Sequence, residues 1–154
     1  MTDKKIIVVD VDGTIANCRH RQHYVQGKHK NWPAFNYAMC DDQPNNDIMW
    51  LIQSVAMRSD VTVVIASGRG EEDRVKTEAW IAEHLTSKFG VAPAKIYMRP
   101  AKDNRKDSII KREILDQIRK DFGEPFMVFD DRNQVVDMWR DNGIRCLQVA
   151  PGDF

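Results

Sequence analysis

Two aspartates, Asp10 and Asp12, follow an apolar run at residues 6–9 and precede Gly13. In an extended backbone, side chains two positions apart lie on the same side, so the two carboxylates should be close together. Two carboxylates at short range oppose each other's ionisation unless a cation or a shared proton intervenes. A calcium-binding EF-hand is excluded, because Gly13 follows Asp12 directly and Arg21 stands where that loop carries its bidentate glutamate. The pair is a candidate for cation-dependent chemistry, and the alternative is a solvated turn, which Asp-Gly favours.

Polar residues follow two further apolar runs. Asp130 and Asp131 come after the run at 125–129, and Ser67 follows the run at 61–66. Carboxylates are the hard oxygen ligands that suit Mg²⁺, and a carboxylate can act as a nucleophile toward phosphorus. A hydroxyl with the backbone amides of a glycine-containing turn can hold phosphate oxygens. In-line phosphoryl transfer needs mainly positioning and charge neutralisation, so these residues predict hydrolysis of a phosphate ester.

Strands and helices should alternate along most of the chain. Apolar runs predict strands at 6–9, 61–66, 95–98, 125–129 and 144–149, and helical spacing predicts helices near 48–56, 75–85, 110–118 and 135–139. Asn46 is the expected cap of the first of these helices. This alternation predicts an α/β fold of three layers, Rossmann-like, with a parallel sheet and helices on both faces. The polar groups after each strand should therefore gather at the carboxyl edge of one sheet.

The segment at about 17–45 shows no clear periodicity and is rich in cations and aromatic residues, with no acidic residue before Asp41. It contains His20, His23 and His29, but their spacing lacks the ligand pairs of a zinc site. Cations interleaved with aromatic rings favour a small cap that contacts an anionic substrate. A plain surface excursion is the alternative.

Length and charge set further limits. A chain of 154 residues suits a single domain, here residues 1–154 with the insertion at about 17–45. The formal net charge is zero, so any basic surface must be local. No apolar stretch reaches the length of a membrane span, no signal-peptide pattern is present, and Cys18, Cys40 and Cys146 have no metal-site spacing. These features predict a soluble cytoplasmic protein that does not bind membranes.

The motifs together resemble a known superfamily. The string at residues 10–14 (DVDGT), Ser67 after a strand, a lysine that opens a later helix (Lys111) and the Asp130-Asp131 pair occur in the order typical of haloacid dehalogenase (HAD) phosphatases. The resemblance implies that Asp10 is the nucleophile and forms an aspartyl-phosphate. Asp12 would protonate the leaving alkoxide and then deprotonate the attacking water. Mg²⁺ would be held by Asp10, Asp130 and the main-chain carbonyl of Asp12, with Asp131 assisting.

A closer resemblance covers nearly the whole chain from about residue 5. The strings at 67–69, 105–111, 130–140 and 148–154 resemble the 3′-phosphatase domain of bacteriophage polynucleotide kinase/phosphatase. This implies a Mg²⁺-dependent 3′-phosphatase for DNA or RNA ends, encoded by a phage and acting in the host cytoplasm in end repair. Substrate-binding positions carried over by the resemblance are Arg21, Gly68, Arg69, Arg99 and Asp107, with Arg19 as an alternative to Arg21. Asp107 and Lys111 are one helical turn apart, so Asp107 could steer the ammonium toward the phosphate, or the two could form an ordinary surface pair.

The chain also departs from that family. It has no Gly-x4-Gly-Lys-Ser/Thr string, so it should not be a 5′-kinase but a stand-alone phosphatase or a fragment of something larger. Two competing functions remain. One is a nucleotidase that uses the same mechanism on nucleoside monophosphates such as nucleoside 3′-monophosphates. The other is a non-catalytic module that binds nucleic-acid ends.

Overall fold

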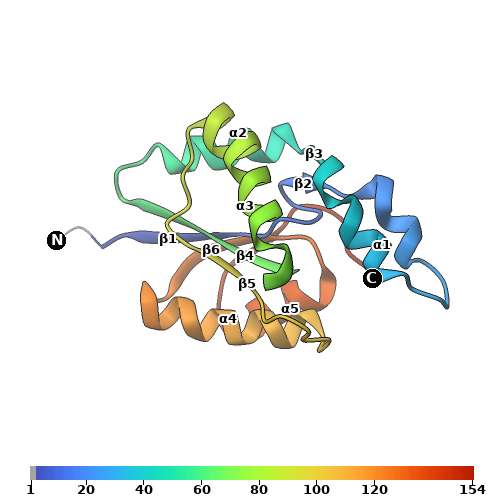
Figure 1. Ribbon diagram of the computed structural model, residues 1–154. Helices are drawn as coiled ribbons and strands as arrows, with labels where there is room; N and C mark the ends of the chain where they lie inside the picture. Colours follow the sequence, from blue (N-terminus) through green and yellow to red (C-terminus); the bar gives the residue numbers. More distant parts are fainter. Residues whose placement is uncertain (1–2) are drawn as a thin grey trace.

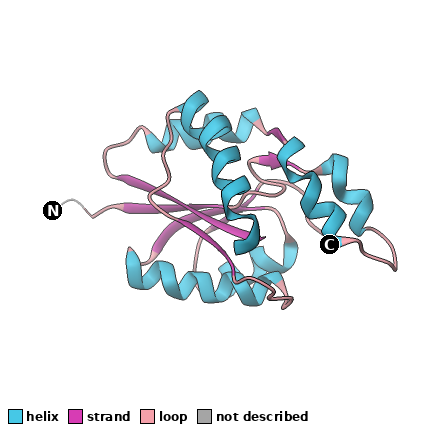
Figure 2. Cartoon of the chain, viewed as in Figure 1, coloured by secondary structure: helices cyan, strands magenta, loops and turns pink. Residues whose placement is uncertain are grey.

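The computed structural model describes residues 3–154, and its centre is a five-stranded sheet whose strands are all parallel. The strand order is β5-β4-β1-β6-β7, with helices on both faces (Figures 1 and 2). The strands are β1 (Lys5–Val9), β4 (Val61–Gly70), β5 (Ile96–Arg99), β6 (Pro125–Asp130) and β7 (Cys146–Gln148). The predicted three-layer α/β fold is therefore confirmed.

Each face of the sheet is covered by its own pair of helices (Figure 1). One layer holds α2 (Asn46–Ala56) and α3 (Arg74–Ile81), and the other holds α4 (Asp107–Asp121) and α5 (Asn133–Asp141). Ile7 and Val9 of β1 pack in the core under the first layer, whereas Ile6 and Val8 pack in the core under the second. Because β1 is buried on both sides, it reads as a continuous apolar run rather than an alternating one.

Between β1 and α2 the chain leaves the main sheet and then returns. Strand β2 (Ala16–Asn17) pairs antiparallel with β3 (Gln43–Pro44), and these two short strands form the base of the excursion. Between them lie the 3₁₀ helix η1 (Arg19–Val25), α1 (Trp32–Tyr37) and the 3₁₀ helix η2 (Ala38–Asp41). We term residues 16–44 the cap segment; it extends beyond the carboxyl ends of the main strands, at the right of Figure 1. Helices this short explain why the sequence shows no periodicity here.

The structure corrects three local predictions. The residue before α2 is Asn45, not Asn46, and its side chain donates to Thr14 O (2.8 Å) instead of capping the helix. Strand β4 continues to Gly70, so Ser67 lies within the end of the strand, where its register with β5 shifts between Ala66 and Gly70. The last strand covers only Cys146–Gln148, which is shorter than the predicted 144–149.

No helix within residues 3–154 is both long enough and apolar enough to span a bilayer.

Candidate active site

The polar residues that follow the central strands meet at one edge of the sheet. Strand β1 lies between β4 and β6, so Asp10, Ser67 and Asp130 come from three neighbouring strand ends. Lys111 reaches the same place from the first turns of α4. All four residues are buried. The structure therefore brings together side chains that the sequence placed after separate strands and, for Lys111, on a later helix.

Three aspartates form what we term the acidic cluster: Asp10, Asp130 and Asp131. Each offers a carboxylate oxygen, and these oxygens lie within 4.8 Å of one another. Lys111 Nζ donates to Asp10 Oδ1 at 2.6 Å and to Asp130 Oδ2 at 2.9 Å, while Thr14 Oγ1 donates to the second oxygen of Asp10 at 3.0 Å. In residues 3–154 no other set of three histidine, cysteine or acidic side chains is placed to hold one ion, so the structure gives the zinc alternative no support.

The acidic cluster has an excess of negative charge. Burial raises the pKa of Asp10 well above its usual range, and the charge of Asp130 raises it further, although Lys111 opposes both effects. Burial and Asp130 also raise the pKa of Asp131 to about 6. Burial alone would lower the pKa of Lys111, but Asp10 and Asp130 raise it, so this lysine stays charged. Three carboxylates facing one ammonium leave two negative charges, and hard oxygen ligands with this charge fit Mg²⁺.

Gly13 makes room for this cluster. The Asp131 carboxylate lies directly against Gly13, where a Cβ atom would overlap it. Gly13 also has φ +83°, a conformation that favours glycine. The glycine of the Asp10–Thr14 string is therefore needed both for the turn and for the position of Asp131.

A second group, which we term the arginine clamp, consists of Asp12, Arg21, Asp42 and Arg69. Asp12 Oδ1 accepts from Arg21 Nη2 at 2.7 Å and from Arg69 Nη2 at 2.7 Å. Asp42 binds the same two guanidinium groups, at 2.6 Å from Arg21 Nη2 and 3.1 Å from Arg69 Nη2. Arg21 is fully buried whereas Arg19 is exposed, so Arg21 is the residue that reaches the site.

Sequence reasoning missed Asp42. This residue lies at the end of η2 in the cap segment and is buried, and its main-chain oxygen accepts from Trp80 Nε1 at 2.9 Å. The sequence offers one signal, since the only acidic residues of the basic segment are Asp41 and Asp42 at its end. No periodicity in the sequence distinguishes the exposed Asp41 from the buried Asp42, because the helices of the cap segment are too short to show a pattern.

The clamp fixes the charge state of Asp12. Burial alone would raise the pKa of Asp12, but Arg69 and Arg21 outweigh it and lower the pKa to about 2. All the hydrogen bonds that Asp12 accepts from residues 3–154 go to Oδ1, which leaves Oδ2 open. The Asp12 side chain is 28% exposed, unlike the nearly closed acidic cluster. Asp12 is thus an ionised carboxylate with one oxygen free to exchange a proton.

Most N–H groups of the two clamp arginines already donate hydrogen bonds to other groups of the protein. Arg21 also donates to Asp42 Oδ1 and to Phe35 O, and Arg69 also donates to Asp12 from Nε and to Thr77 Oγ1. A guanidinium has five N–H donors, so each arginine keeps a single free N–H. The resting structure therefore does not leave either arginine free for the bidentate phosphate contact that their chemistry suggests.

Arg99 and Asp107 hold the end of β4 beside Ser67. Arg99 donates to Gly68 O at 2.9 Å and to Asp107 Oδ1 at 3.2 Å, and the Asp107 carboxylate packs where a Cβ of Gly68 would be. The expected contact between Asp107 and Lys111 does not form. Lys111 binds two carboxylates from β1 and β6 instead, and these outweigh the neighbour one turn away on its own helix.

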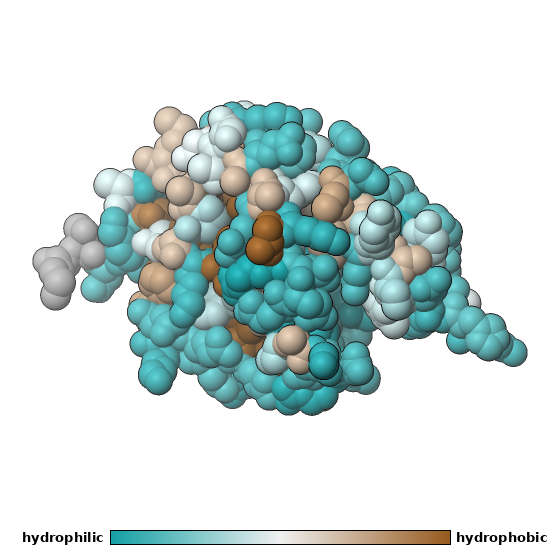
Figure 3. Space-filling model, in the orientation of Figure 1, coloured by the Kyte–Doolittle hydropathy of each residue, from teal (hydrophilic) through white to brown (hydrophobic). Residues whose placement is uncertain are grey.

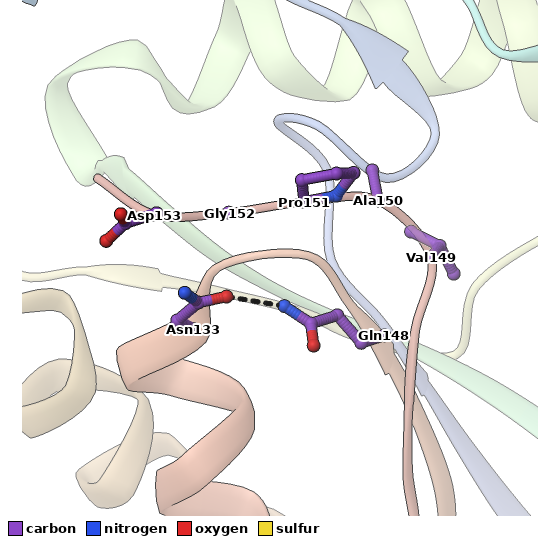
Figure 4. A pocket seen from close by; sticks show the side chains of 7 residues that line it. All are labelled: Asn133, Gln148, Val149, Ala150, Pro151, Gly152 and Asp153. Carbon is purple, nitrogen blue, oxygen red and sulfur yellow. Dashed lines mark hydrogen bonds between the residues drawn. The ribbon is translucent and has the colours of Figure 1, made fainter.

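An open groove, whose lining is shown in Figure 4, includes a residue that contacts the backbone of Asp131. Its lining consists of Asn133, Gln148 and residues 149–153. Gln148 Nε2 donates to Asn133 Oδ1 at 2.6 Å and to Asp131 O at 2.9 Å. Gln148 in the groove thus holds the backbone of Asp131. No carboxylate of the arginine clamp or of the acidic cluster lines the groove.

Comparison with known proteins gives a consistent result. The family model for the polynucleotide kinase PNKP phosphatase domain matches residues 4–154. A protein of Autographa californica nuclear polyhedrosis virus, described as a bifunctional polynucleotide kinase/RNA ligase, is 28% identical over 137 residues, which are 89% of this chain and 18% of that protein. The chain therefore spans about a fifth of the length of this relative.

Solved structures show the same relationship. A chain of the Pnkp1/Rnl/Hen1 RNA repair complex is 30% identical with a TM-score of 0.79, over 98% of this chain and 44% of that one. A HAD family enzyme from Bacteroides thetaiotaomicron, solved with magnesium and inorganic phosphate, shares the fold with a TM-score of 0.58 at 14% identity, over 98% and 96% of the two chains. The chain belongs to the polynucleotide kinase PNKP phosphatase domain family, whose members are hydrolases with the HAD fold.

Proposed function

We propose that this chain is a Mg²⁺-dependent 3′-phosphatase that converts 3′-phosphate ends of DNA or RNA into 3′-hydroxyl ends. The observation that carries the proposal is the position of Asp10, which lies in a buried acidic cluster with the Lys111 ammonium 2.6 Å away. The family match supports the reaction class. A module that only binds nucleic-acid ends has no need for a buried nucleophile of this kind.

In the first step, an Asp10 carboxylate oxygen attacks phosphorus and the bond to the leaving 3′-oxygen breaks. The alkoxide takes a proton from Asp12 Oδ2, and the phosphoryl group remains as an aspartyl-phosphate on Asp10. At rest Asp12 is ionised, so its proton must arrive with the substrate. A bound phosphate next to Asp12 raises the pKa of that carboxyl by charge repulsion, and the monoester monoanion can supply the proton.

In the second step, a water attacks the phosphorus of the aspartyl-phosphate. Asp12 takes the proton of that water, the bond between phosphorus and the Asp10 oxygen breaks, and inorganic phosphate leaves with the Asp10 carboxylate restored. Asp12 suits both steps because its side chain is partly exposed and its Oδ2 accepts no hydrogen bond from residues 3–154. The arginine clamp keeps that oxygen in one orientation.

The remaining residues of the site would bind the metal ion or offset the negative charge of the phosphate. Asp10, Asp130 and Asp131 would hold Mg²⁺, which would neutralise the cluster and the incoming phosphate. Lys111 offsets charge on the phosphate oxygens as well as on Asp10. Ser67 accepts from Arg69 N at 3.1 Å and can offer its hydroxyl proton to a phosphate oxygen. Arg99 and Asp107 hold the Gly68 backbone next to Ser67.

The test compares phosphate release from three substrates, each with Mg²⁺ and with EDTA. These are a 3′-phosphorylated oligonucleotide, the same oligonucleotide phosphorylated at its 5′ end, and a nucleoside 3′-monophosphate. Metal-dependent release from the first substrate alone would support the proposal. Faster release from the mononucleotide would make the chain a nucleotidase, and no release from any substrate would favour the binding module.

A further inference from the structure

A row of side chains in contact with one another leads from the active site to the surface of the cap segment. Arg21 Nη2 binds Asp12 Oδ1 at 2.7 Å, and the Arg21 guanidinium carbon lies 4.1 Å from the centroid of the Phe35 ring. Phe35 in turn packs edge to face against Trp32, with 5.6 Å between ring centroids. Lys30 Nζ lies 5.8 Å from the centroid of the Trp32 ring. We term Phe35, Trp32 and Lys30 the aromatic track.

The track begins where the proposed leaving group must lie. Asp12 protonates the 3′-oxygen in the proposed mechanism, so the nucleoside that carries this oxygen must be on the Asp12 side of the phosphate. Asp12 is also more exposed than the acidic cluster. The Arg21 guanidinium connects Asp12 to the Phe35 ring, because it contacts both. The Trp32 ring comes next and is 45% exposed.

The charge around the track suits an anionic chain. Arg19, Lys28 and Lys30 are exposed on the cap segment, and within residues 3–154 none of them forms an ion pair with a carboxylate. No acidic residue occurs from residue 13 to residue 40. The tip of the cap segment is a hydrophilic projection at the right of Figure 3. The acidic cluster would repel a phosphate backbone, so the cap is the favourable side.

We propose that the cap segment binds the single strand of DNA or RNA that leads to the 3′-phosphate, with bases stacked along Phe35 and Trp32 and backbone phosphates near Arg19, Lys28 and Lys30. Aromatic faces accept any base, and lysines contact phosphates without reading sequence. This inference rests on the proposed function and adds to it that the preferred substrate is a polymer end rather than a mononucleotide. Sequence preference should be weak.

The first experiment measures binding separately from turnover. The full chain is titrated in EDTA with a fluorescently labelled, 3′-phosphorylated oligothymidylate, and the Kd is read from fluorescence anisotropy. Loss of one base–aromatic stacking contact should raise the Kd about tenfold in Trp32→Ala, while Trp32→Phe should recover most of the affinity. The matched control is Trp50→Ala, which removes a tryptophan of α2 that is 63% exposed and lies outside the cap segment.

A second measurement separates stacking from charge. An abasic strand of the same length should bind more weakly to the wild type, and Trp32→Ala should not weaken it further. The double variant Lys28→Ala/Lys30→Ala should reduce the slope of log Kd against log salt by about 1 to 2, whereas Lys88→Ala should leave it unchanged. Lys88 is exposed and follows the π-helical turn after α3.

The outcomes discriminate between the two proposals. Equal Kd values for wild type and Trp32→Ala, or equal losses in Trp32→Ala and Trp50→Ala, would overturn the track. The same holds if Trp32→Ala weakens the abasic strand as much as the oligothymidylate, or if the lysine variant keeps the wild-type salt slope. Binding that depends on Trp32 in a wild type that releases no phosphate would overturn the phosphatase proposal and leave the track standing.

Discussion

The two halves of the site have opposite electrostatic states. In the arginine clamp, two carboxylates meet two guanidinium groups, and the pKa of Asp12 is lowered to about 2. In the acidic cluster, three carboxylates meet one ammonium, and the pKa of Asp131 is raised to about 6. The clamp is thus complete without a ligand, whereas the cluster is strained until a cation binds.

This difference assigns separate tasks to the two halves. A balanced network of hydrogen-bonded ions holds its members in one geometry, which suits a proton-exchanging group that must face the substrate in a fixed direction. An unbalanced cluster retains affinity for a cation, which suits a metal-dependent nucleophile. Changes within the clamp should therefore act mainly on stability and orientation, and changes within the cluster mainly on catalysis and metal binding.

The largest effect is expected for Asp10→Asn. The amide keeps the size of the side chain but cannot attack phosphorus, so turnover should fall by at least about 10³-fold. The Thr14 and Lys111 contacts involve one oxygen each, and the fold should persist. Steady-state phosphate release with circular dichroism as the check on folding measures both. Activity within tenfold of wild type would remove Asp10 as the nucleophile.

The next effect concerns the clamp. Asp42→Ala removes one of the two carboxylates that the buried guanidinium groups of Arg21 and Arg69 share, which leaves only Asp12 to balance two positive charges. The free energy of unfolding should therefore fall by about 3–5 kcal/mol. Urea unfolding measures this change. Asp41→Ala is the matched control, because Asp41 is the exposed neighbour and should change stability by less than about 0.5 kcal/mol. Equal effects of the two substitutions would mean that the clamp does not stabilise the fold.

The sequence predicts the cluster better than the clamp, for a physical reason. Asp10, Ser67 and Asp130 end buried strands, and in a parallel sheet the strand ends meet at one edge, so local patterns suffice to place them. Phe35 lies on a helix of less than two turns, and Asp42 directly follows another short helix. The positions of these helices depend on contacts with Arg21 and Trp80, which are distant in the sequence. Lys111 shows the same limit, since its partners come from other strands and not from its own helix.

The two halves should also respond to pH with opposite signs. Asp131 has a raised pKa, so between about pH 4 and 6 the folded state binds more protons than the unfolded state, and stability falls as the pH rises through this window. Asp12 has a lowered pKa, so its stabilising effect is complete above about pH 4 and is lost only as the pH falls toward 2. Of these two aspartates, only Asp131 should therefore change the stability between pH 4 and 7.

Unfolding in EDTA at about pH 4.5 and about pH 7.5 tests this difference. The wild type should be less stable at the higher pH than at the lower pH. In Asp131→Asn this loss of stability should be smaller by up to about 2–3 kcal/mol. Adding Mg²⁺ at the higher pH should stabilise the wild type by about 3 kcal/mol at 100 times its Kd, and Asp131→Asn by less. If the free energy of unfolding of Asp131→Asn changed with pH by the same amount as that of the wild type, the charge repulsion in the acidic cluster would not affect stability.

The smallest expected effect uses the cysteines as reporters. Cys18 and Cys146 are buried, and Cys40 is exposed. Burial raises the pKa of both buried thiols to about 12, aided by Asp12 at Cys18 and by Asp130 at Cys146. Since the thiolate is the reactive form, a disulfide reagent at about pH 8 should label Cys40 quickly and the other two slowly.

In a Cys40→Ser background, the two slow thiols then report on one half each. Asp42→Ala should speed the labelling of Cys18 several-fold more than that of Cys146, because it loosens the clamp and leaves the cluster with Lys111 intact. Mass spectrometry of the labelled peptides resolves the two rates. If both thiols gain the same rate, the two halves open as a single unit, and the balance of charge within each half would not determine its separate stability.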